Sequence, residues 1–79
     1  MTLLSSPQGQ WLKVVSLNGG QHLRARLAQY GIFPGDCLRV LRAAPLKGPL
    51  LVDVNGREIA LGRGVAEKIL VEVSECASR

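Results

Sequence analysis

Aromatic side chains and histidine are scarce in this 79-residue chain. Trp11, Tyr30 and Phe33 are its only aromatic residues and make up 4% of the sequence. Grooves that bind proline-rich peptides and platforms that stack nucleic-acid bases both need several aromatic side chains. His22 is the single histidine, and no nucleophile is placed beside it, because Cys37 belongs to a different expected element. We therefore expect a protein that binds another molecule and is not an enzyme.

The chain also lacks a cysteine framework and any long apolar run. Cys37 and Cys76 are too few and too far apart for a disulfide framework or a zinc knuckle. We expect reduced thiols and assign neither cysteine a role. Residues 1–10 lack the basic and apolar regions of a secretory signal, and no apolar stretch approaches the ~20 residues that cross a membrane. These absences predict a cytoplasmic protein that does not insert into a membrane.

Charge is modest and evenly spread along the sequence. Ten Lys and Arg residues against six Asp and Glu residues give a net charge of +4, and the basic residues are scattered. This balance permits contact with nucleic acid or an anionic surface without requiring either. We interpret the basic residues as a solvated surface and do not expect nucleic acid as the partner. With 47% apolar and 20% charged residues, the chain has the composition of one folded domain with an aliphatic core.

The clearest local pattern runs from Gln21 to Asp36. Its apolar residues recur at helical spacing and predict an amphipathic helix whose buried face is Leu23, Leu27 and Tyr30. Gly31 follows as the left-handed residue that commonly ends a helix. Pro34 and Gly35 then fit the two central positions of a type II turn. The sequence therefore predicts a helix, a stop and a sharp turn in succession.

Alternating apolar residues predict five strands, at 10–17, 36–43, 50–54, 57–61 and 68–73. Asn55-Gly56 is the strongest short signal for a two-residue type I′ turn, so the third and fourth strands form a hairpin. In its register Val52 faces Ile59 and Asp53 faces Glu58. The first strand alternates imperfectly, and a bulge near Val15 or Ser16 would reconcile its pattern.

Five short strands with one short helix after the first strand are too few for a sandwich. A small, strongly bent β-barrel is the economical mainly β fold, because closure hides the edge strands. The expected domain covers residues 9–73, after a flexible lead-in at 1–8 and before a C-terminal tail at 74–79. Alternate strand residues, together with one helix face, form the expected core: Leu12, Val14, Leu38, Val40, Val52, Ile59, Leu61, Ile69, Val71 and Val73.

Asp53 and Glu58 face each other on the outer side of the expected hairpin. Like charges in this position repel by up to about 1 kcal/mol, and a divalent cation between them would remove the repulsion. Two carboxylates need a third ligand, which His22 or a neighbouring molecule, as in a weak homodimer, could supply. No cofactor is required. Weak binding of Fe(II) or Zn(II) and ordinary surface charges are both left open.

Three ordered segments resemble one known family. They are RLAQYGIFPGD at Arg26–Asp36, AAPLKGPLLVDV at Ala43–Val54 and IALGRGVAEKILVEV at Ile59–Val73, and together they are similar to the ferrous iron transport protein A (FeoA) family. The resemblance implies a small SH3-like β-barrel that assists ferrous iron uptake. It also implies a partner, a membrane permease with its own cytosolic GTPase domain, and a position at the inner face of the cytoplasmic membrane when docked.

Apolar and basic side chains outside the expected core are candidates for that contact: Phe33, Leu41, Leu51, Leu70, Arg24 and Arg26. Interface energy is concentrated in a few large side chains, so we expect docking to depend on Phe33 and at least one leucine. The two arginines would steer the approach to an acidic partner. The runner-up is a basic small barrel that binds nucleic acid or acts as a metal-dependent regulatory module. Binding to nucleic acid would weaken steeply with salt.

Overall fold

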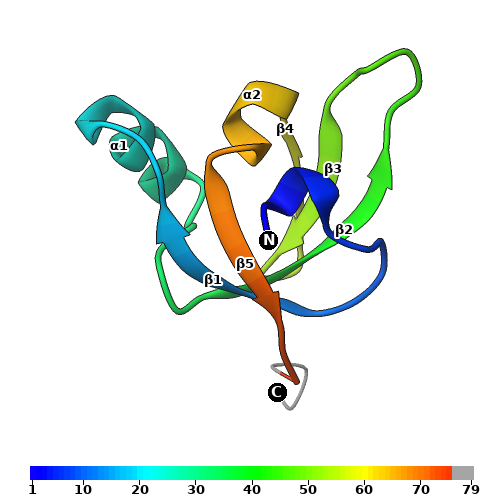
Figure 1. Cartoon of the computed structure of the whole chain (residues 1–79), viewed down its shortest axis with the longest axis horizontal. Helices are drawn as coiled ribbons and strands as arrows, with labels where there is room; N and C mark the ends of the chain where they lie inside the picture. The colour runs from blue at the N-terminus through cyan, green and yellow to red at the C-terminus, as the bar shows by residue number, and fades with distance from the viewer. Residues whose placement is uncertain (76–79) are drawn as a thin grey trace.

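Five antiparallel strands form one curled sheet in the computed structural model, which describes residues 1–75 (Figure 1). The strands lie in the order β4-β3-β2-β1-β5. This is the mainly β fold, with a helix after the first strand, that the sequence predicts. In chain order the elements are η1 (Leu3–Ser5), β1 (Leu12–Leu17), α1 (Gln21–Gln29), β2 (Cys37–Ala43), β3 (Leu50–Val54), β4 (Arg57–Leu61), α2 (Arg63–Ala66) and β5 (Ile69–Val73).

Two bulges bend the sheet. One register shift lies between Val14 and Ser16 in β1, and the other lies between Val40 and Arg42 in β2. The first is the bulge that the sequence predicts, whereas nothing in the sequence signals the second. Because a bulge increases the local twist of its strand, the two together curl the sheet around its inner face.

The inner face of the sheet and one face of α1 enclose an aliphatic core. No polar or charged side chain is buried among the described residues, so the core is held by apolar burial, worth roughly 25 cal/mol per Å². The predicted strand core is confirmed except that Ile59 is only half-buried and Val73 is 56% exposed. On the predicted helix face Leu27 is buried, whereas Leu23 and Tyr30 are half-buried against the core. The prediction for Val73 is wrong because this residue ends the edge strand β5, where no further strand covers its side chain.

The first five residues pack against the sheet, in contrast to the flexible lead-in that the sequence suggests for 1–8. Leu3 is 1% exposed within the core. Thr2 forms a β-bridge with Leu70, and the Val71 N–H donates to the Met1 carbonyl oxygen over 2.8 Å. A single buried leucine carries no periodic pattern, so the sequence gives no signal for this contact.

The end of α1 is a Schellman motif. Gly31 has a φ of 81°. Its N–H donates to the Ala28 carbonyl oxygen over 2.9 Å, and the Ile32 N–H donates to the Leu27 carbonyl oxygen over 2.9 Å. These bonds satisfy carbonyls that the helix leaves without partners, and they direct Ile32 into the core, where it is fully buried. The predicted helix stop at Gly31 is confirmed.

Two hairpins use the same turn geometry with different residues. Asn55 and Gly56 have φ angles of 54° and 82°, as a type I′ turn requires, which confirms that prediction. Leu46 and Lys47, at the tip of the β2–β3 hairpin, have φ angles of 59° and 60°. Left-handed backbone costs an ordinary residue roughly 1–2 kcal/mol, whereas Gly and often Asn adopt it readily. The β2–β3 hairpin therefore carries backbone strain that the β3–β4 hairpin avoids.

Replacing the glycine that ends α1 should destabilise the protein. We predict that Gly31→Val lowers the free energy of unfolding by more than about 1 kcal/mol, because a β-branched residue fits positive φ badly. The added Cβ would meet its nearest neighbour, an Arg57 nitrogen, at an ordinary 3.5 Å, so backbone strain and not crowding sets the effect. Urea unfolding measures the change. Gly64→Val in α2, where nothing lies within 4 Å of the added Cβ, is the control, and equal stability of the two variants would contradict the prediction.

Giving the strained hairpin the residues of the relaxed one should stabilise the protein. We predict that Leu46→Asn combined with Lys47→Gly raises the free energy of unfolding by roughly 1–2 kcal/mol, because both new residues tolerate left-handed backbone. Urea unfolding is again the measurement. The reciprocal change, Asn55→Leu with Gly56→Lys, should lower stability by a similar amount. A less stable Leu46→Asn, Lys47→Gly variant would show that contacts outweigh strain at this turn.

Candidate functional site

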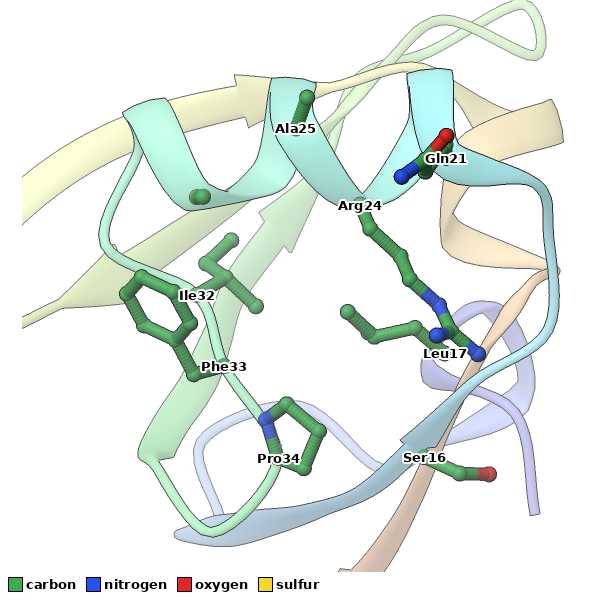
Figure 2. Close-up of a pocket in the computed structure, with 9 residues that line it drawn as sticks. Ser16, Leu17, Gln21, Arg24, Ala25, Ile32, Phe33 and Pro34 are labelled. Atoms are coloured by element: carbon green, nitrogen blue, oxygen red, sulfur yellow. The ribbon is translucent and has the colours of Figure 1, made fainter.

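A groove of about 490 Å³ lies between α1, the end of β1 and the Phe33–Pro34 turn (Figure 2). Its volume falls in the usual range for binding sites. Leu17 and Ile32 lie at its floor, both buried in the core, and their side chains point toward the space between the helix and the strand (Figure 2). The groove is therefore an apolar slot that opens directly above the core.

One wall of the groove is a face of α1. Gln21, Arg24, Ala25 and Ala28 line it and recur at i, i+3, i+4 and i+7, which places them on one side of a helix. Leu27 is on a different side of the helix and is fully buried. Because the two alanines are small, they leave room between the helix and β1 for an incoming side chain.

The opposite wall is the turn that carries Phe33 and Pro34. Gly35 has a φ of 94°, and the Asp36 N–H donates to the Phe33 carbonyl oxygen over 3.0 Å, which confirms the predicted turn. The Gly35 N–H also donates to the Val14 carbonyl oxygen over 2.7 Å, while the Phe33 N–H donates to Asp36 Oδ2 over 2.9 Å. These bonds hold the backbone of the turn in place and leave the Phe33 side chain 51% exposed.

The groove has a cation on its helical wall. The Arg24 side chain extends from α1 toward Leu17 (Figure 2). Among residues 1–75 the only ion pair joins Arg39 to Asp53, so no carboxylate of the described chain neutralises Arg24. The sequence of α1 itself contains no Asp or Glu. An apolar slot with a cation on its wall suits an apolar group that lies next to a carboxylate.

The structure brings together two of the residues that the sequence singles out for partner binding. Arg24 and Phe33 both line the groove, on opposite sides of it (Figure 2). Arg26 is exposed on α1 and does not line the groove. The three leucines predicted with them lie half-buried on β2, β3 and β5, also outside the groove: Leu41, Leu51 and Leu70. Sequence reasoning missed Ala25 and Ala28, although their helical spacing from Gln21 was a usable signal.

Arg39 organises a second cluster, on the outer face of the sheet. Its Nε donates to Asp53 Oδ2 over 3.2 Å, and its guanidinium carbon lies 4.7 Å from the centre of the Trp11 ring. Asp53 Oδ1 accepts a hydrogen bond of 3.0 Å from the Gly56 N–H. The cluster thus links β2, β3 and the β3–β4 turn. The sequence predicts none of these three contacts.

The candidate metal ligands are only partly brought together. Asp53 and Glu58 pair across the β3–β4 hairpin as predicted, but Asp53 already accepts hydrogen bonds from Arg39 and the turn backbone. His22 is exposed on α1, and no group of three or more His, Cys, Asp or Glu side chains in the described range could hold a metal ion. Binding of Fe(II) or Zn(II) at this pair stays a prediction.

Cys37 begins β2 and is half-buried. It is disulfide-bonded, so the expectation of a reduced thiol at this position is wrong. Cys76 lies outside the described residues, as does most of the predicted tail.

Comparison with known proteins identifies the family. The FeoA domain family matches residues 1–73. The chain belongs to the FeoA domain family. This match begins at the first residue, in agreement with the packing of Leu3 in the core of the FeoA fold.

Individual FeoA relatives agree with the assignment. A putative Fe(2+) transport protein A from Methanocaldococcus jannaschii is 36% identical over 92% of this chain and 87% of the relative. The solution structure of iron(II) transport protein A from Clostridium thermocellum superposes with a TM-score of 0.87 at 29% identity, over 92% of this chain and 45% of that one. The solution structure of FeoA protein from Chlorobium tepidum superposes with a TM-score of 0.84 at 36% identity, over 92% of this chain and 70% of that one.

Within residues 1–75, no helix is long and apolar enough to span a membrane.

Removing the Asp53 carboxylate should weaken the cluster around Arg39. We predict that Asp53→Asn lowers the free energy of unfolding by about 1 kcal/mol, because Arg39 and the Gly56 N–H lose a charged acceptor while Arg39 stays partly solvated. The repulsion between Asp53 and Glu58 would predict the opposite sign. Thermal or urea unfolding decides between the two. Glu58→Gln, at an exposed position with no such partners, is the control and should change stability little.

Proposed function

We propose that this protein is a small accessory protein of ferrous iron uptake that docks on the cytosolic GTPase/permease component of the transporter and modulates Fe(II) transport. Membership of the FeoA family and relatives named for Fe(2+) and iron(II) transport support this role. Docking would place the protein in the cytoplasm, at the inner face of the membrane. It acts as a binding module and not as an enzyme.

The observation that carries the mode of docking is the groove that Phe33 and Arg24 line from opposite sides. Phe33 keeps half of its side chain in water although the backbone of its turn is held by hydrogen bonds. A large side chain held on a fixed backbone loses little conformational freedom when it is covered, which favours binding. Arg24, on the opposite wall of the groove, supplies a charge for a carboxylate of the partner, and Arg26 on the same helix extends the positive field.

The three half-buried leucines are secondary in this proposal. Leu41, Leu51 and Leu70 lie on the outer faces of three strands and do not line the groove. Since contacts around a central anchor mainly exclude water, one of these leucines would contribute only where the partner extends around the sheet. The groove is the centre of the docking surface.

Nucleic-acid binding, or a role as a metal-dependent regulatory module, remains the runner-up. The net charge of +4 favours nucleic acid as a ligand. However, Trp11 is half-buried and lies over Arg39, so it is not presented as a surface for base stacking. Strong dependence on salt would favour this second function, because phosphate binding releases counterions.

Surface plasmon resonance with the purified GTPase domain of the permease tests the proposed function. We predict that Phe33→Ala weakens binding by about 1–3 kcal/mol, because the anchor is lost, with little change in the melting temperature. Charge reversal at Arg24 and Arg26 should mainly slow association, and the effect should fade at high salt.

Val73→Ala is a matched control, because Val73 is as exposed as Phe33 and lies at the far end of β5. It should bind like the wild-type protein. Unchanged affinity of Phe33→Ala would place the docking surface elsewhere, and unfolding of that variant would show that Phe33 supports the fold instead of the contact.

A further inference from the structure

The tip of the β2–β3 hairpin holds one leucine almost wholly in water. Leu46 is 98% exposed, the most exposed of the large apolar residues in the described chain. The loop around it is closed by two backbone hydrogen bonds. The Ala44 N–H donates to the Pro49 carbonyl oxygen over 2.9 Å, and the Gly48 N–H donates to the Pro45 carbonyl oxygen over 3.1 Å. Leu46 is therefore presented on a fixed turn between two prolines.

The fold gives no structural reason for a leucine and a lysine at this tip. Leu46 and Lys47 both have left-handed backbone, which disfavours them. The other hairpin of the same chain solves the same geometric problem with Asn55-Gly56. Leu46 gains no burial in return. Backbone strain retained without a structural gain is typical of sites that serve binding or catalysis.

The charge of the hairpin defines the kind of surface that it fits. Arg42 and Lys47 are both exposed, and the sequence between Val40 and Val52 contains no Asp or Glu. The hairpin thus presents one exposed apolar side chain, Leu46, together with two cations and no carboxylate. The complementary surface is an apolar pocket with acidic residues at its rim.

We propose that the Leu46–Lys47 tip is a second docking element, which inserts Leu46 into an acid-rimmed apolar pocket on the protein partner. This inference rests on the proposed function, because it takes the GTPase domain as that partner. A second copy of this chain is a poor occupant of this role, since its own groove carries the cation Arg24. Nucleic acid would find no aromatic ring at the tip on which to stack a base.

A membrane surface is also a weaker candidate than a protein pocket. Even a whole acyl chain gives only marginal membrane binding, and one leucine offers much less apolar surface. A protein pocket, in contrast, benefits from the rigid turn, because a pre-formed knob loses little freedom on binding. The hairpin tip and α1 lie on opposite sides of the molecule (Figure 1), so the partner would contact two separate regions.

Binding of the GTPase domain to the Leu46→Asn, Lys47→Gly variant tests the proposal. We expect affinity to fall about tenfold or more, as for the loss of an interface anchor, while the melting temperature rises because the backbone strain is relieved. Lys47→Gly alone keeps Leu46 and relieves half of the strain. It should therefore retain most of the affinity, with a small loss that disappears at high salt.

The remaining outcomes decide against the proposal in distinguishable ways. Wild-type affinity in the double variant would overturn the hairpin as a docking element and leave the proposed function intact. No binding of the wild-type protein to the GTPase domain would overturn both. Flotation with phosphatidylglycerol–phosphatidylethanolamine vesicles gives the third outcome, because vesicle binding that depends on Leu46 would assign the tip to a membrane. Val73→Ser, which removes an equally aliphatic exposed residue, should bind the domain like the wild-type protein.

Discussion

The reversal of the chain at the end of α1 is the constraint on which the candidate site depends. The left-handed Gly31 sends Ile32 into the core, and the residue that follows must then return to the surface. Phe33 is exposed for this reason, and Pro34 turns the chain back toward β1. The groove exists because the helix, the turn and the strand meet at this reversal. Without the glycine, both the buried floor and the exposed wall would lose their positions.

Local chemistry explains why much of the fold is predictable from sequence. Asn55-Gly56, Gly31 and Pro34-Gly35 each favour a narrow range of backbone angles, so the hairpin, the helix stop and the turn follow directly from these residues. The bulge in β1 is also visible, because it breaks an alternating pattern. Contacts without a periodic signal are not predictable in this way. Leu3 packs in the core from an isolated position, and the strained turn at Leu46–Lys47 contradicts the preference of its own residues.

The candidate site is less predictable, because it depends on which elements become neighbours. The sequence identifies Arg24 and Phe33 as exposed, but only the fold, which leaves a groove between α1 and β1, places them on opposite walls. The same applies to Asp53. Its opposition to Glu58 follows from one turn, whereas its ion pair with Arg39 needs the pairing of β2 with β3, which contains a bulge that the sequence does not signal. Contacts that follow from a single turn are therefore predictable from this sequence, whereas contacts that require a third strand are not.

The contrast between the two hairpins has a consequence for the order of folding. A tight turn with favourable residues closes quickly and can form within microseconds, so β3 and β4 can pair around Asn55-Gly56 before the rest of the sheet is present. The connection between β2 and β3 is longer, because it runs from Ala43 to Leu50. It also resists closure, because Leu46 and Lys47 must enter a disfavoured conformation. We therefore expect β2 to join a pre-formed β3–β4 hairpin, before strands that are distant in the sequence have formed their hydrogen bonds. We expect this step to limit the rate at which the sheet forms.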